Sequence, residues 1–233
     1  LHRRRVSLKK FAEFLSDRGE LEKSSVQEVA GWQQNLWVEI ASREAVYLSE
    51  DEVDLLFKVM DLEDKPRNLR DKAIISLILG TGVSIGTLVE LNLSDLNLQK
   101  HRVRVDIASN QWFGIVDSVE YLEQYLVISR PELTQTASEE ALFVSQMGGR
   151  ITRQGAWQVI KAWGIAAGLE IALSPRVLRH TAVRRMIEQD KPLKKIQQML
   201  GHNNEHSTQA LLRKILKSMD LGGLNGQERI YHD

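Results

Sequence analysis

The chain has 233 residues, 42% of them hydrophobic and 27% charged, and it contains no cysteine. These values exclude a disulfide-stapled miniprotein and a thiolate metal site, and no apolar run approaches the length of a membrane span. The formal net charge is zero, which excludes a uniformly basic nucleic-acid binder. We therefore expect a folded protein of a reducing cytoplasmic compartment, without metal, cofactor or membrane association.

Apolar periodicity predicts helices from the start of the chain onward. Residues 7–18 place Leu8, Phe11 and Phe14 on one stripe, and residues 48–60 begin with a capping box of Ser49 and Glu52. The further helices that we predict cover 68–82, 85–98, 118–130, 152–169, 178–189, 193–200 and 207–219. Pro131 is expected to close the helix over 118–130.

Two stretches alternate with a period of two instead. Residues 101–107 place Val103, Val105 and Ile107 on one face, and 112–117 can return as the second strand of a hairpin. Residues 141–145 predict another short strand. The expected fold class is therefore mainly α with a small antiparallel sheet (α+β), in a domain that spans 47–220 and is followed by a flexible tail over 221–233.

Charge is segregated along the chain despite the zero sum. Residues 43–65 carry eight acids against three bases, whereas 174–202 carry seven lysines and arginines against two acids. Two short helices with cations on their polar sides are suited to a phosphate backbone, although solvated helices also carry charge without that role. The predicted DNA-binding residues are Arg176, Arg179, Arg184, Arg185, Lys194 and Lys195, together with the basic N-terminal segment.

Several stretches resemble one family in the same order along the chain. "SPRVLRHTA" at 174–182 with "LGH" at 200–202 is similar to the C-terminal signature of the tyrosine recombinases, also called phage integrases. "GTGVSIGTLVELNLSDL" at 80–96 resembles the first box of that family, and 142–169 resembles the stretch before the signature. The resemblance covers about 47–212. It implies that 1–30 is a remnant of an N-terminal core-binding domain and that 31–46 is a linker.

The resemblance also implies a chemistry. Family members cut and rejoin duplex DNA through a covalent phosphotyrosine, with two arginines on the phosphate oxygens, histidines that move protons, and a hairpin lysine on the leaving oxygen. Two of those positions are retained, at Arg179 and His202. The departures from the family pattern are Ser84 for the first arginine, Ala108 for the lysine, Arg176 for a histidine and Leu211 for the nucleophile, with Thr87 in place of an acid.

Leucine has no nucleophilic oxygen, and a serine hydroxyl does not replace a charged guanidinium fork. We therefore predict a degenerate recombinase, a pseudoenzyme that binds double-stranded DNA without cleaving it, with an active recombinase or a second copy as a further partner.

Three alternatives stay open. The first is an active site-specific recombinase that uses Tyr231 as a displaced nucleophile. The second is an interaction module that has lost DNA binding and docks through the stripe of Leu211, Leu212, Ile215, Leu216 and Met219, although such a stripe is more often core. The third, an ordinary helix-turn-helix regulator, explains only 178–202.

Overall fold

A computed structural model describes residues 16–17, 45–62, 65–106, 110–134, 139–201 and 205–219. Apart from the first two, these residues belong to one compact unit, Ala45–Asp233. Most of the predicted helix over 7–18, most of the remnant over 1–30, most of the linker and the tail over 221–233 lie outside the described residues, as do His202, Ala108, Ile107 and Tyr231.

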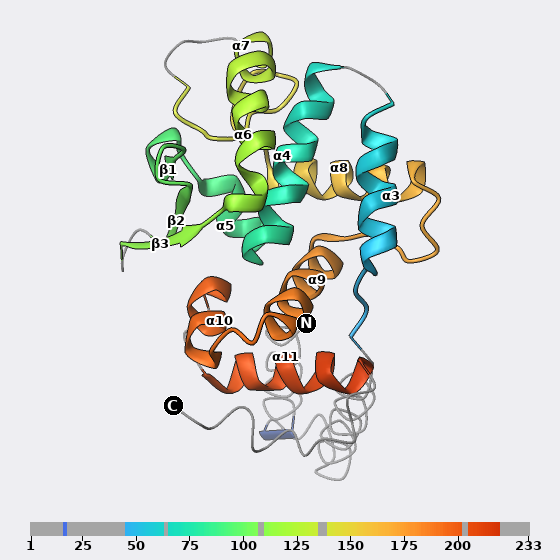
Figure 1. The fold of residues 1–233 in the computed structure, drawn as a ribbon. Helices are drawn as coiled ribbons and strands as arrows, with labels where there is room; N and C mark the ends of the chain where they lie inside the picture. Colours follow the sequence, from blue (N-terminus) through green and yellow to red (C-terminus); the bar gives the residue numbers. More distant parts are fainter. Residues whose placement is uncertain are drawn as a thin grey trace. The chain divides into compact units, whose positions relative to one another are not determined.

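The described part is mainly helical with one small antiparallel sheet, which confirms the predicted α+β class (Figure 1). Its α-helices are α3 (Glu50–Met60), α4 (Pro66–Thr81), α5 (Ile85–Glu90), α6 (Val119–Gln124), α7 (Arg130–Leu133), α8 (Arg153–Ala166), α9 (Pro175–Glu188), α10 (Leu193–Leu200) and α11 (Glu205–Ser218). The strands are β1 (Leu96–Asn97), β2 (Arg102–Asp106) and β3 (Gln111–Gly114), and the short helical turns are η1 (Leu93–Asp95), η2 (Val116–Ser118) and the π-helical η3 (Tyr125–Ser129).

Local sequence signals set several of these bounds. Ser49 caps α3, and the Glu52 carboxylate accepts from the Ser49 N–H at 2.7 Å. The predicted capping box is therefore confirmed. Gly82 ends α4 with φ of 66°, a left-handed conformation that suits glycine. Ser174 caps α9 and Pro175 occupies its first position, as expected for a residue with no N–H to leave unpaired.

Several details of the sequence prediction were wrong. The helix expected over 85–98 ends at Glu90, because Leu91 is extended and the following chain forms η1 and then β1, a strand that was not predicted. Pro131 does not close the preceding helix. There the Arg130 N–H bonds to the Tyr125 carbonyl five residues back, and this wide π turn leads into α7 with Pro131 in its first turn.

The strand expected over 141–145 is reduced to isolated bridges at Ala141 and Val144. On α8, Ile160 is buried, whereas Trp157 and Ile165 are 39% and 70% exposed. The alternation expected on β2 is interrupted by a register shift between Arg104 and Asp106, although Val103 is buried as predicted.

Two hydrophobic clusters share helix α9. Its first turn contributes Val177 and Leu178 to a large core formed with α3, α4, α5, α6 and α8. Its second half contributes Val183 and Met186 to a smaller core shared with α10, α11 and Phe113 of β3. In Figure 1, α9 runs from α4 toward the layer of α10 and α11. Residue 179 therefore lies where the two cores meet.

None of the described helices is long and apolar enough to cross a membrane.

Candidate nucleic-acid interface

Arg179 ties together the ends of two helices. Its Nη1 donates to the carbonyl oxygen of Gly82 and its Nη2 to that of Leu200, both at 2.8 Å. These carbonyls lie at the C-termini of α4 and α10, where the helix dipoles place partial negative charge that favours a cation. Burial lowers the pKa of Arg179 to about 10, so the guanidinium is still protonated at neutral pH.

The segment beyond Gly82 carries two of the departures from the family pattern. Ser84 is the N-cap of α5, and its Oγ accepts from the Thr87 N–H at 3.1 Å. The Ser84 Oγ and Thr87 Oγ1 are also hydrogen-bonded to each other at 2.9 Å. Both residues remain partly exposed. A residue pair that the family pattern gives as arginine and acid is therefore a neutral, self-capping pair of hydroxyls in this chain.

Leu211, at the expected position of the nucleophile, lies on α11 and packs against the smaller core. The neighbouring Leu212 and Ile215 are buried, so the interpretation of this stripe as core is confirmed for them. The end of α11 is fixed to the start of the unit. The Ala45 N–H donates to the Ser218 Oγ at 2.8 Å, and the Tyr47 hydroxyl donates to the Ser218 carbonyl at 3.1 Å.

His180 has a structural position beside Arg179. It is buried, and its Nδ1 lies 3.0 Å from the Val46 carbonyl oxygen, so this ring nitrogen donates the hydrogen bond. Burial is the main cause that lowers the His180 pKa below its usual value, and the nearby charges of Arg176, Lys214 and Arg179 act in the same direction. The neutral ring therefore anchors the chain at Val46.

Two of the predicted DNA-binding residues are engaged in ion pairs. Arg185 forms a fork with Glu50, with its Nε 3.0 Å from Oε1 and its Nη2 2.5 Å from Oε2. Arg184 pairs with Glu188 at 2.8 Å and donates to the Leu48 carbonyl at 3.0 Å. Their positive charge is thus largely used within the protein.

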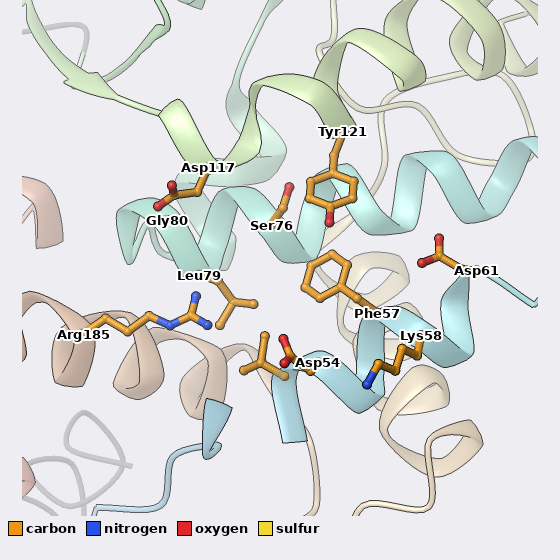
Figure 2. A pocket seen from close by; sticks show the side chains of 11 residues that line it. Asp54, Phe57, Lys58, Asp61, Ser76, Leu79, Gly80, Asp117, Tyr121 and Arg185 are labelled. Atoms are coloured by element: carbon orange, nitrogen blue, oxygen red, sulfur yellow. The ribbon is translucent and has the colours of Figure 1, made fainter. Parts of the chain in front are cut away.

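One cavity lies beside Arg185, and Arg179 is not among the residues that line it. It measures about 430 Å³ and runs between α3, α4 and α6 (Figure 2). Its wall includes Phe57, Tyr121 and the carboxylates of Asp54 and Asp117. Lys58, Asp61 and Arg185 also line this cavity, so its wall has mixed charge and includes one of the predicted DNA contacts.

The other predicted contacts remain available to solvent. Arg176, Lys194 and Lys195 are exposed, and the Lys195 Nζ lies 5.5 Å from the centre of the Phe113 ring. Arg176 is the second residue of α9, after Pro175, whereas the two lysines occupy the first turn of α10. The structure thus separates the six predicted cations into two that are ion-paired, three that are exposed, and Arg179, which bridges two helices.

Sequence reasoning missed Arg153, which begins α8 after the N-cap Thr152. Its guanidinium lies against Gly86, because a Cβ added there would meet the Arg153 Cζ and Nη2 at 3.3 Å. Gly86, inside the first turn of α5, was the one signal of this contact in the sequence. Glycine is disfavoured within a helix, so its presence there indicates that another group approaches the backbone closely.

Comparison with known proteins agrees with this arrangement. The profile of the Phage integrase family matches residues 46–214. The tyrosine recombinase XerD of Staphylococcus epidermidis (strain RP62A) is 34% identical over 165 residues, which cover 70% of this chain and 56% of the relative. The tyrosine recombinase XerC of Roseiflexus castenholzii is 32% identical over 213 residues, covering 89% and 65%. The chain therefore spans less than two thirds of the length of these relatives.

Solved structures show the same fold. The crystal structure of XerA recombinase superposes with a TM-score of 0.64 and 24% identity, covering 93% of this chain and 83% of that one. A post-cleavage complex of XerH site-specific recombinase with its palindromic difH substrate gives 0.62 and 17%, covering 79% and 54%. By sequence and by fold, the chain belongs to the phage integrase family of tyrosine recombinases.

Proposed function

We propose that this protein binds duplex DNA in a recombination or integration process and does not cleave DNA by the phosphotyrosine route. The observation that carries the proposal is the position of Leu211, an apolar side chain packed against the smaller core where the family places its nucleophile. Leucine has no hydroxyl, so the residue at this position cannot attack phosphorus.

The charge arrangement supports the same conclusion. Position 84 carries a serine hydroxyl that caps α5 and pairs with Thr87, so it supplies no permanent charge to a transition state. Loss of one such contact typically lowers the rate by on the order of 10²–10³. Arg179 remains charged, but two of its donors are directed to backbone carbonyls.

The DNA-binding part of the proposal rests on the exposed cations. Arg176, Lys194 and Lys195 are exposed in the first turns of α9 and α10, and Arg179 joins these two helices through its hydrogen bond to the Leu200 carbonyl. Two of the structural neighbours, XerH and lambda integrase, were solved on DNA. The proposed partner is accordingly double-stranded DNA, with an active recombinase or a second copy of the chain as a further partner.

Binding to duplex as a function of salt tests this proposal. Fluorescence anisotropy with random-sequence duplex is expected to give an affinity that falls steeply with salt, by about 0.9 in log K per log salt for each phosphate contacted. The double variant Lys194→Gln/Lys195→Gln should bind more weakly with a shallower slope. Arg67→Gln is the matched control, because Arg67 is exposed near the start of α4, about 22 Å along that helix from Gly82.

Failure to bind any duplex, or binding that does not depend on salt, would refute the DNA-binding proposal. The second part, the absence of cleavage, needs a separate measurement of covalent adducts.

A further inference from the structure

The Arg153 side chain is held against the segment that carries Ser84. Helices α5 and α8 pack together, and the Arg153 guanidinium covers Gly86 so closely that an added Cβ would lie 3.3 Å from Cζ and Nη2 and 3.4 Å from Nε. Contacts this short are tighter than ordinary van der Waals contact. The absence of a side chain at position 86 therefore allows the guanidinium to lie on the first turn of α5.

Arg153 differs from most other arginines of the domain in how its charge is used. It is exposed, and within the described ranges no carboxylate or carbonyl oxygen accepts from it. By contrast, Arg150 donates to the carbonyls of Val89 and Leu91, and Arg185 is paired with Glu50. A guanidinium that is positioned by packing but not neutralised is suited to an external anion.

The neighbouring hydroxyls offer a second donor. Ser84 and Thr87 have two hydroxyl protons between them, and their mutual hydrogen bond uses one. The Thr87 N–H also donates to the Ser84 Oγ. This second hydrogen bond occupies a lone pair of the serine oxygen and uses no hydroxyl proton. One O–H of the pair is left to donate, and both residues are partly exposed.

A second cation lies at the other end of the same segment. Arg179 donates to the Gly82 carbonyl, four residues before Gly86. Residues 82–86 are thus bracketed by two guanidinium groups, and Ser84 lies between them along the chain.

We propose that Arg153 and the Ser84–Thr87 hydroxyl pair form a contact site for one phosphate of the DNA backbone. The inference rests on the proposed DNA-binding function. It assigns Arg153 to contact with the phosphodiester and not to support of the fold. The bound group is a phosphate oxygen that accepts from the guanidinium and from the remaining hydroxyl.

Arg153→Gln tests the site, because glutamine keeps a polar side chain and removes both the charge and the guanidinium fork. In the salt titration of duplex binding, this variant should bind several-fold more weakly than the wild type, and its slope should be shallower by about 0.9. Arg67→Gln removes one exposed charge elsewhere and should leave the affinity and slope close to those of the wild type.

Gly86→Ala tests the geometry without removing a charge. The added methyl group would push the flexible end of Arg153 away, and alanine is favourable in a helix, so the fold should be kept. We expect a smaller loss of affinity than in Arg153→Gln, and no further loss when the two changes are combined.

The outcomes separate this inference from the proposed function. If Lys194→Gln/Lys195→Gln weakens binding while Arg153→Gln behaves like Arg67→Gln, the phosphate site is wrong and the DNA-binding function stands. If Gly86→Ala adds its full effect to that of Arg153→Gln, the two residues do not act together and the site is wrong as described. If the wild type binds no duplex, both proposals fail.

Discussion

The Ser84 Oγ and the Thr87 Oγ1 lie 2.9 Å apart and form a hydrogen bond at the first turn of α5. They are three positions apart along the chain, the spacing at which an N-cap side chain meets the third residue of a helix. Because the two hydroxyls satisfy each other and the Thr87 N–H, this segment is stable without an arginine at 84 or an acid at 87. Its local structure is compatible with the loss of catalytic charge.

The cap itself can be measured. Ser84→Ala should lower the free energy of unfolding by about 1 kcal/mol, because the Thr87 N–H loses its acceptor. Ser84→Asn supplies another good capping oxygen and should stay close to the wild type. Urea denaturation of the three proteins checks this, and equal stabilities would show that the cap does not contribute.

Arg179 should be required for folding as well as for any contact with DNA. Arg179→Ala leaves the carbonyls of Gly82 and Leu200 without their donor, and we expect the free energy of unfolding to fall by about 3 kcal/mol. Arg179→Lys keeps a cation but cannot donate in two directions from a planar fork, so it should recover only part of the loss. Thermal unfolding measures both, and an unchanged Tm in Arg179→Ala would contradict this role.

The buried His180 should make stability depend on pH. Its folded pKa is lowered from 6.5, so the unfolded chain binds the proton more readily than the folded one. The stabilisation is therefore complete above about pH 6.5 and is lost as the pH falls toward the folded pKa. His180→Asn keeps a donor for the Val46 carbonyl and cannot titrate.

Urea denaturation at pH 7.5, 6.5 and 5.5 tests this expectation. The wild type should lose more stability across this range than His180→Asn does, and parallel curves would show that His180 is not the group responsible.

Arg185 and Lys194 provide a direct comparison between a paired and an unpaired cation. Arg185 is held by Glu50, which also has its own pKa lowered mainly by the hydrogen bond from Arg185. We therefore expect Arg185→Gln to change duplex affinity less than Lys194→Gln at the same salt concentration. The opposite order would mean that DNA displaces Glu50 and that the original prediction for Arg185 holds.

Much of the fold was accessible from the sequence because strong periodic segments are locally consistent. The capping box at Ser49 and Glu52 and the helical periodicity over 48–60 and 193–200 each predict the observed structure. The errors fall where long-range contacts decide. Leu91 turns extended because its carbonyl accepts from Leu142, and the π turn before Pro131 packs on α4.

The candidate site was only partly accessible. Motif spacing identifies Arg179, Ser84 and Leu211, but it cannot show that Arg184 and Arg185 are occupied by Glu188 and Glu50, since these partners depend on side-chain placement. Arg153 was missed for the same reason, because its contact with Gly86 joins residues that are far apart along the chain.

The measurement that tests the account most directly is a search for a covalent protein–DNA adduct. Duplexes would first be selected from a random pool by binding to the wild-type protein. They would then be prepared with a nick at each position in turn, so that a cleaved strand cannot religate. The protein–DNA mixtures would be analysed on denaturing gels. The account predicts complexes that dissociate in salt and no adduct that survives denaturant. An adduct that survives denaturant in the wild type and is lost in Tyr231→Phe would contradict the account and establish a displaced nucleophile.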